Sequence, residues 1–315
     1  MGANHPHDSL FRDVFSRPRL AAHQLRAVLP PALLAQLDLD RVRTADTSFI
    51  AQSLGTFQAD LLFEVPWAQR LAYVYVLHEH QSTVDRFMAQ RLLLYMSLIW
   101  DRHRKTHESQ RRLPPIVPVV IYQGGQPWTG STAFEALVAY PPGEEGILGP
   151  HVPRFEFVLD DLSESSEAAL RSRSEEPLAT LALLLLKLAQ LEREAFLQAL
   201  LRLADLLNRI EDHGDRVLIT RYILVLAKSQ SEEVLQTLDA AVTRPVKEAL
   251  MTAAEQLQER GRLSERRRCL LKALARLANV DDATRARVDS APADQLELWF
   301  DRALEAKTLT EVFGE

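Results

Sequence analysis

Two carboxylates and one amide stand in the two most strand-like segments of the sequence. Asp60 lies in the first segment, and Glu79 and Gln81 lie two residues apart in the second. Successive side chains of a strand point to opposite faces, so Glu79 and Gln81 share one face. Antiparallel pairing around a turn near residues 66–70 would bring Asp60 within a residue or two of Glu79, and directly opposite residues have Cβ atoms about 5 Å apart. We therefore expect the two carboxylates to meet.

Two carboxylates in contact need a proton, a cation or solvent, because like charges repel and burial penalises each of them. Mg²⁺ suits such a pair, since it takes oxygen ligands, keeps several waters and often uses one or two carboxylates beside a substrate phosphate. The spacing alone also fits a second interpretation, in which Asp60 and Glu79 are ordinary strand-end residues that face water.

The elements that must position these residues are predicted from periodicity and breakers. Two amphipathic helices precede the strands, a long helix follows Glu79, and the apolar run IVPVVIY predicts a buried strand in which Pro118 indicates an edge or a bulge. The predicted helices of this part are 9–15, 20–28 and 84–105, and the predicted strands are 47–50, 56–65, 71–81, 116–122 and 155–159. This pattern indicates a mixed α/β domain.

The second half of the chain is Leu- and Ala-rich, has helical periodicity and contains few aromatic residues. Its predicted helices are 178–188, 193–209, 217–228 and 246–260, followed by a helical tail beyond Gly261. The predicted fold class is therefore α/β followed by an all-α region.

The formal charge of -6 hides an uneven distribution along the 315 residues. Residues 1–130 carry 14 Lys and Arg against 11 Asp and Glu, whereas the remainder carries 23 against 32. This balance argues against a generic basic coat for nucleic acid but not against a local basic patch. One such cluster follows Glu79 and is expected to contact DNA phosphates, with an ordinary charged helix face as the alternative. Its members are Arg86, Arg91, Arg102, Arg104 and Lys105.

Cys269 is the only cysteine, so the chain can form no internal disulfide and no cysteine-built zinc site. The sequence contains no signal-peptide pattern and no apolar stretch approaching about 18 residues. We expect a cytoplasmic protein with no membrane partner. His103 and His107 have the i, i+4 spacing of a zinc pair, but no Glu lies between them and no third ligand is evident, so a solvated helix face is the favoured interpretation.

Several motifs occur in a fixed order and carry a family resemblance. They are HDSLFRDVFSRP near the start, QADLLFEV from Gln58, YVYVLHEHQS, RLLLYMSLIW and LPPIVPVVIYQGGQPW. Together they resemble the recombination-promoting nuclease family, also called YhgA-like transposases, within the PD-(D/E)XK nuclease superfamily. The resemblance covers about residues 7–210. It implies a restriction-endonuclease-like mixed sheet flanked by helices.

The resemblance also implies roles for individual residues. Asp60 and Glu79 would bind Mg²⁺, with Mn²⁺ as the alternative ion, and Gln81 would take the place that Lys holds in the usual superfamily pattern. A neutral amide can orient water or phosphate through hydrogen bonds but cannot steady a developing oxyanion by charge. Asp8 would supply an accessory acidic group, and an N-cap role for Asp8 is the alternative. The implied activity is metal-dependent hydrolysis of DNA phosphodiester bonds that promotes recombination.

The same resemblance suggests three parts, namely a nuclease domain over 1–176, a helical extension over 177–260 and a small helical module over 261–315. We expect DNA as the partner, and a homodimer formed through the helical C-terminal part. Two other hypotheses stay open at this point. The chain could be a catalytically weak or inactive nuclease fold that binds DNA, or it could cleave RNA, because nothing in these residues distinguishes a 2′-hydroxyl.

Overall fold

The computed structural model describes residues 6–50, 61–68, 70–79, 84–227 and 231–314. The chain divides into two compact units, Met1–Lys247 and Glu248–Glu315. The strands are β1 Arg43–Ala45, β2 Leu61–Trp67, β3 Arg70–Glu79, β4 Ile116–Tyr122 and β5 Val158–Asp161. The helices of the first part are α1 Pro6–Phe15, α2 Pro18–Val28, α3 Pro31–Leu34, α5 Met88–Thr106, α6 Glu145–Leu148, α7 Glu167–Arg171 and α8 Pro177–Leu188, with short 3-10 helices at Leu39–Arg41, Phe134–Leu137 and Gly149–His151.

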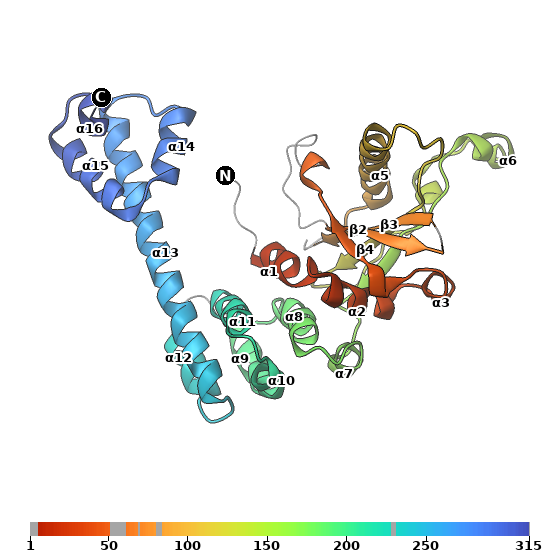
Figure 1. Cartoon of the computed structure of the whole chain (residues 1–315), viewed down its shortest axis with the longest axis horizontal. Helices are drawn as coiled ribbons and strands as arrows, with labels where there is room; N and C mark the ends of the chain where they lie inside the picture. Colours follow the sequence, from red (N-terminus) through yellow and green to blue (C-terminus); the bar gives the residue numbers. More distant parts are fainter. Residues whose placement is uncertain (1–5, 51–60, 69, 80–83, 228–230, 315) are drawn as a thin grey trace. The chain divides into compact units, whose positions relative to one another are not determined.

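All five strands form one mixed sheet in the order β1-β2-β3-β4-β5. The first three strands pair antiparallel, with Trp67 opposite Arg70 at the turn and Leu61 opposite Val76. The last three strands pair parallel, and α5 makes the crossover from β3 to β4. Figure 1 shows α1 and α2 on one side of the sheet and α5 on the other. The predicted antiparallel pair around the turn, the long helix and the returning strand are therefore confirmed, and so is a mixed sheet with flanking helices.

The strand predicted over 47–50 is wrong. The first strand lies earlier, at Arg43–Ala45, and pairs with β2. It ends at Ala45 because the carboxylate of the next residue, Asp46, accepts hydrogen bonds from both the N–H and the hydroxyl of Ser48, at 2.9 and 2.7 Å. Such a local side-chain bond offers the backbone an alternative to the sheet ladder.

Pro118 lies in an interior strand but at a position where its missing N–H costs little. It pairs with Tyr75 of β3, whereas the ladder between β4 and β5 begins only at Val119 and Val158. Among the described residues, Pro118 is therefore paired with β3 only and not with β5, which fits the edge position that the sequence indicates.

The two faces of the sheet are covered by different helices. On one face, Phe11 and Phe15 of α1 and Leu25 of α2 pack with Phe63 and Val76 around a small apolar cavity. On the other face, residues of α5 pack against Leu62, Tyr73, Tyr75 and Val120. The α5 residues of this second cluster are Met88, Ala89, Leu92, Tyr95 and Ile99.

Helix α8 is apolar on all sides and is buried accordingly. Its residues from Leu178 to Leu186 are all buried, and the helix contacts α1 and α2 as well as α10 and α11. A helix with no polar face must be covered all round. α8 therefore joins the sheet layer to the helical layer that follows, and Figure 1 shows it between α2 and α11.

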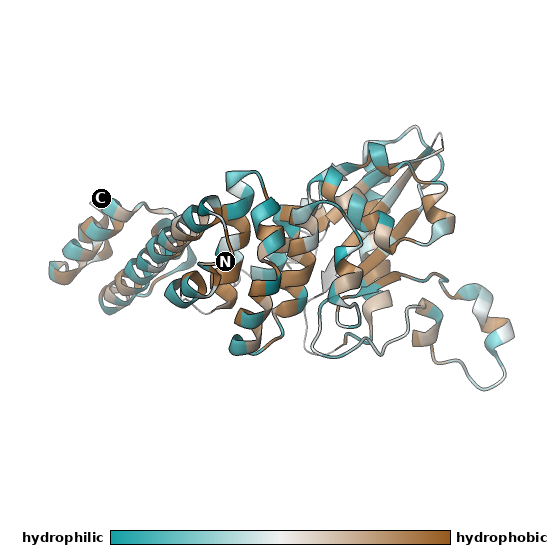
Figure 2. Ribbon diagram, turned by 90° about the horizontal axis from the view of Figure 1, so that it is seen from below, coloured by the Kyte–Doolittle hydropathy of each residue, from teal (hydrophilic) through white to brown (hydrophobic). Residues whose placement is uncertain are grey.

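The remaining helices are α9 Arg193–Arg202, α10 Ala204–Arg209, α11 His213–Leu226, α12 Ser231–Leu238, α13 Arg244–Leu277, α14 Asp282–Ser290, α15 Ala293–Glu305 and α16 Leu309–Phe313. A break near Gly261 is wrong, because α13 continues through this residue for 34 residues in all. The neighbours of Gly261 are mostly strong helix formers, and an interior Gly costs only about 1 kcal/mol relative to Ala. The hydropathy colouring of Figure 2 shows these helices as amphipathic.

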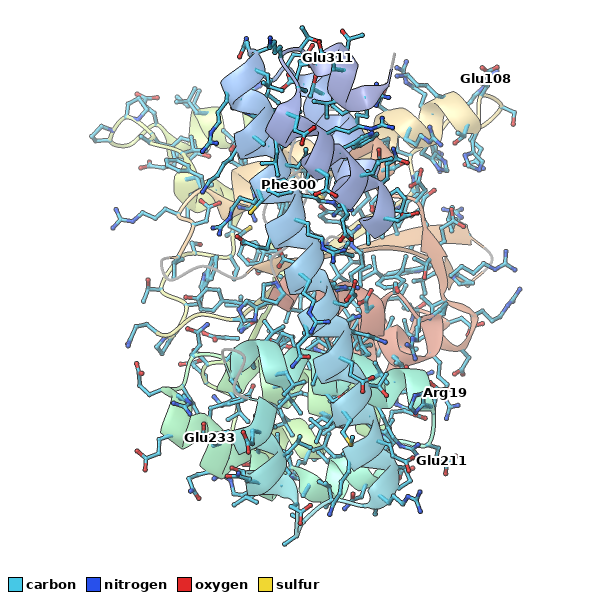
Figure 3. The ribbon with its side chains drawn as sticks, turned by 90° about the vertical axis from the view of Figure 1, so that its left-hand side faces the viewer. Arg19, Glu108, Glu211, Glu233, Phe300 and Glu311 are labelled. Atoms are coloured by element: carbon cyan, nitrogen blue, oxygen red, sulfur yellow. The ribbon has the colours of Figure 1, made fainter. Side chains whose placement is uncertain are left out.

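The second unit has its own core. Leu270 and Leu274 of α13 pack with Val288, Leu296 and Trp299 from the helices that follow. Charged residues such as Glu311 point outward, and Phe300 lies on α15, as Figure 3 shows. The predicted homodimer through this part and the three-part division of the chain stay predictions.

Candidate active site

The carboxyl ends of the three parallel strands lie side by side. Glu79, the last residue of β3, pairs with Tyr122, the last residue of β4, and Tyr122 pairs with Asp161, the last residue of β5. The backbones of Glu79 and Asp161 are thus two strand spacings apart, roughly 10 Å. In open sheets with parallel strands, ligands bind outside the carboxyl ends. This edge is the candidate active site.

Asp161 organises the loop that borders this edge. Its Oδ2 accepts a hydrogen bond from the backbone N–H of Trp128 at 2.7 Å, and its Oδ1 accepts one from the N–H of Ser163 at 2.8 Å. The Trp128 ring packs edge-on against Tyr122, with centroids 5.1 Å apart, and its indole N–H donates to the carbonyl of Gly130 at 2.8 Å. Asp161 therefore fixes the loop of residues 126–128 beside the strand ends.

Gly124 is required by the side chain of Tyr122. A Cβ atom at Gly124 would overlap the Tyr122 ring, whereas one at Gly125 would meet only the Oε1 of Gln190, at 3.8 Å. Gly124→Ala is expected to displace Tyr122 and to lower the free energy of unfolding by about 1–3 kcal/mol. Gly125→Ala is the matched control and should stay within about 0.5 kcal/mol of the wild type. Urea denaturation measures both, and equal stability of the two variants would contradict this packing.

Of the predicted residues Asp60, Glu79 and Gln81, the structure describes the position of Glu79 alone. Glu79 is placed by its backbone at the carboxyl end of β3, in the register given above. Asp60 directly precedes Leu61, the first residue of β2, and both Asp60 and Gln81 lie outside the described residues. The predicted convergence of these three residues therefore stays a prediction.

Asp8 belongs to a different part of the fold. α1 begins at Pro6, so Asp8 lies in the first turn of this helix, where a negative charge is favourable, and the N-cap alternative is wrong. The neighbouring His7 has its Nδ1 2.5 Å from the hydroxyl of Tyr222 on α11. Burial, and then the charge of Asp8, raise the pKa of Tyr222. The accessory role of Asp8 stays a prediction.

The predicted phosphate-binding residues divide between the two ends of α5. Arg86 and Arg91 lie at its start, and Arg91 pairs with Asp85 at 3.1 Å. At its end, Arg104 and Lys105 both pair with Asp101, at 2.8 and 2.6 Å. Arg102 lies over the ring of Phe49. The nearest members of the two groups, Arg91 and Arg102, are 11 residues or roughly 16 Å apart along the helix, so the two groups would contact different phosphates.

His103 and His107 form a stacked pair rather than a zinc site. Their rings are 4.2 Å apart and nearly parallel. His103 is buried, so the predicted solvated helix face is wrong for this residue. Its Nδ1 lies 3.1 Å from the hydroxyl of Tyr73 and its Nε2 lies 3.0 Å from Oε1 of Gln110. Among the described residues, no three His, Cys, Asp or Glu side chains gather in a way that could hold a metal ion.

The buried hydroxyl of Tyr73 makes a pH-dependent contribution to stability. Burial, followed by the charge and hydrogen bond of Glu64, raises the pKa of Tyr73 to about 12. Below about pH 10, the pKa of a tyrosine in the unfolded chain, the hydroxyl is protonated in both states and the folded state keeps its full stability. As the pH rises from about 10 toward about 12, only the unfolded state ionises, so this stability is lost. We expect the free energy of unfolding to fall by on the order of 2 kcal/mol over this interval. Tyr73→Phe should fall less steeply when urea denaturation is repeated at each pH, and identical slopes would contradict the assignment.

A buried ion pair on the opposite face of the sheet was not predicted. Asp160 is 5% exposed and accepts two hydrogen bonds from Arg173, at 2.7 and 2.8 Å, and one from Gln24 of α2 at 2.7 Å. The sequence indicated only an acidic run over 160–167. No local signal could have identified the pair, because Gln24 is 136 residues away in the chain.

A family model described as "Putative transposase, YhgA-like" matches residues 5–217. The chain is 34% identical over 127 residues to the recombination-promoting nuclease RpnD of Escherichia coli O157:H7, which is 39% of this chain and 48% of that protein. It is 34% identical over 119 residues to the inactive recombination-promoting nuclease-like protein RpnE of E. coli K12, covering 38% and 39%. It is 26% identical over 266 residues to RpnA of the same strain, a recombination-promoting nuclease, covering 82% and 86%.

The alignments with RpnD and RpnE span about half or less of those proteins. No solved structure matches the chain. Within the described part of the chain, no helix is long and apolar enough to cross a membrane.

The fold defines a class of protein with a mixed sheet, helices on both faces and acidic positions at the carboxyl ends of β3 and β5. The chain belongs to the YhgA-like transposase family, whose model matches more than half of its length.

Proposed function

We propose that this protein is a metal-dependent DNA endonuclease with a PD-(D/E)XK-type site, which hydrolyses phosphodiester bonds and promotes recombination. The observation that carries the proposal is the position of Glu79 at the carboxyl end of β3, in a hairpin, helix and returning strand of the expected order. Relatives named recombination-promoting nucleases support the same activity.

The donor chemistry of Asp60 and Glu79 fits a hard divalent cation such as Mg²⁺, with Mn²⁺ as the alternative. Such an ion, when bound, lowers the pKa of a water and polarises the phosphate. Asp60 and Glu79 would hold it through carboxylate oxygens. Gln81 would orient the attacking water or the phosphate by hydrogen bonds, because its amide has donors and acceptors but no charge. Asp8 enters the proposal only as an accessory acidic group.

The basic residues of α5 would contact the DNA backbone at separate places. Arg86 and Arg91 would lie nearest to the cleaved phosphate, since they are at the start of α5, and Arg102, Arg104 and Lys105 would contact phosphates farther along the duplex. Because such contacts release counterions, the affinity should fall steeply as the salt concentration rises.

Incubation of supercoiled plasmid with purified protein tests the proposal. We expect Mg²⁺-dependent nicking that EDTA abolishes. A matched RNA substrate in the same buffer should be cleaved more slowly. Preferential cleavage of the RNA would show that RNA, and not DNA, is the substrate. Equal nicking in the presence and absence of EDTA would contradict metal dependence.

A second candidate is a DNA-binding protein with an inactive nuclease fold. The observation that favours it is the 34% identity to RpnE, which is named an inactive recombination-promoting nuclease-like protein. This candidate predicts salt-sensitive DNA binding with no Mg²⁺-dependent strand cleavage at any protein concentration.

A further inference from the structure

Phe87 exposes a large aromatic ring to solvent at the start of α5. Its side chain is 63% exposed, although it lies between the half-buried Asp85 and the buried Met88. Burying a side chain of this size stabilises a protein by about 1.5–3 kcal/mol, so the position forgoes that contribution. A single exposed apolar residue is common and proves nothing alone. The backbone around Phe87 and its position in the fold indicate a binding role for this exposed ring.

The turn that carries Phe87 is held on several sides. Oδ1 of Asp85 accepts a hydrogen bond from the Phe87 N–H at 2.9 Å, and Oδ2 of Asp85 accepts one from Arg91 at 3.1 Å. Val84 packs toward Gly130 in the loop that Asp161 fixes. The backbone is therefore ordered while the ring points away from the core. An ordered backbone reduces the entropy that is lost when the ring binds a flat partner.

The turn also lies at the level of the candidate active site. Tyr95 and His103 of α5 contact Tyr75 and Tyr73 of β3, at centroid distances of 5.6 and 5.8 Å, so α5 runs antiparallel to β3. From Tyr95 back to Phe87 is about 12 Å along the helix. From Tyr75 forward to the end of β3 is about 13 Å along the strand. Phe87 therefore lies toward the same end of the sheet as Glu79, the last residue of β3.

We propose that Phe87 stacks on an unpaired base of DNA, with the exposed Arg86 beside it contacting the neighbouring phosphate. The choice of DNA as partner rests on the proposed function. Bases of a duplex cover each other's faces, whereas an unpaired base offers its face to an aromatic side chain. The substrate class is therefore single-stranded DNA or duplex with locally unpaired bases. Leu94, 40% exposed and two turns farther along the same side of α5, extends the apolar contact.

Fluorescence anisotropy in EDTA tests the contact, because binding can be measured there without cleavage. The probes are an oligothymidylate of about 20 nucleotides, which has no pairing of its own, and a blunt duplex of the same length. Phe87→Ala should weaken binding of the single strand roughly 5- to 100-fold, while binding of the duplex stays within about twofold. Phe87→Trp keeps an aromatic face and should restore the affinity.

Leu113→Ala is the matched control, since Leu113 is 53% exposed beyond the other end of α5 and should not affect either probe. Unchanged single-strand affinity in Phe87→Ala, or an equal loss for both probes, would overturn the proposal. The outcome is separable from the proposed function. If the wild type never nicks DNA but Phe87→Ala loses single-strand binding, the proposed function fails and the Phe87 contact stands. If the wild type nicks DNA but Phe87→Ala binds the single strand as well as the wild type does, only the Phe87 contact fails.

Discussion

Glu79→Gln is expected to lower the rate of Mg²⁺-dependent plasmid nicking by at least about 100-fold. The substitution keeps the size of the side chain but removes the charge that would hold a divalent cation at the carboxyl end of β3. Single-turnover nicking with protein in excess over plasmid measures the rate, and thermal unfolding shows whether the variant is folded.

Glu64→Gln is the matched control for this prediction. Glu64 also lies in the sheet, on β2, where it pairs with Tyr73 six residues before Glu79 on the adjacent strand. Its replacement should leave nicking within about twofold of the wild type. If Glu64→Gln and Glu79→Gln reduced nicking equally, the loss would report on the sheet as a whole and not on a catalytic carboxylate.

Arg173→Ala is expected to destabilise the protein by about 3–5 kcal/mol, because it leaves the carboxylate of Asp160 buried without its partner. Arg173 donates to both oxygens of Asp160, and its Nη2 also donates to the hydroxyl of Ser165 at 3.0 Å. The pair fixes the end of β5 relative to α2 and to the segment that leads into α8. Urea denaturation monitored by circular dichroism measures the change.

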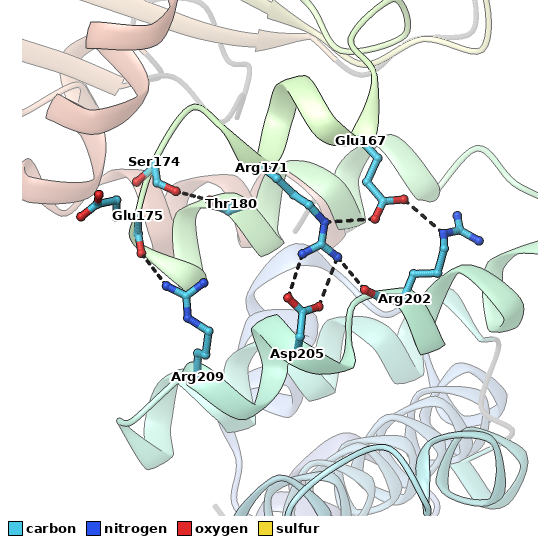
Figure 4. Close-up of polar contacts among 8 residues, drawn as sticks. All are labelled: Glu167, Arg171, Ser174, Glu175, Thr180, Arg202, Asp205 and Arg209. Carbon is cyan, nitrogen blue, oxygen red and sulfur yellow. Dashed lines mark hydrogen bonds and ion pairs between the residues drawn. The ribbon is translucent and has the colours of Figure 1, made fainter.

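Arg171 supplies the comparison, because it forms four hydrogen bonds with more exposed partners, against three for Arg173. Figure 4 shows its guanidinium between Glu167, Asp205 and the carbonyl of Arg202. Asp205 is 58% exposed, so solvent screens the pair, and Arg171→Ala should cost about 1 kcal/mol or less. In addition, Asp160→Asn combined with Arg173→Ala should be less destabilising than the sum of the two single changes. Equal effects of the Arg171 and Arg173 variants would contradict the role of burial.

The sheet could be predicted where local signals agree. The run YVYVL and the apolar IVPVVIY are strands because β-branched and aromatic residues dominate them, and the long apolar face of α5 has a helical period. The first strand was missed because it is three residues long and is stopped by a side-chain bond of Asp46 that no periodicity reports. The helix end predicted at Gly261 is wrong, because the free-energy cost of one glycine in a helix is smaller than the summed helix propensity of its neighbours.

The candidate site could be predicted only in part. The strand that carries Glu79 could be predicted from the apolar run before it, whereas the role of Glu79 as a metal ligand rests on the family resemblance and stays a prediction. Asp161 was not assigned a role, since its partner Trp128 is 33 residues away and contributes only a backbone N–H. The cation cluster after Glu79 appeared continuous in sequence, but a helix of 19 residues separates its members along about 28 Å.

A Mn²⁺ titration followed by electron paramagnetic resonance tests most directly whether Asp60 and Glu79 hold a divalent cation. The wild-type protein, Asp60→Asn and Glu79→Gln are titrated side by side, with Glu64→Gln as the control. We predict that the wild type and Glu64→Gln deplete the free Mn²⁺ signal equally, and that each of the other two variants weakens uptake at least about tenfold. Equal uptake by all four proteins would contradict a metal site built from these two carboxylates.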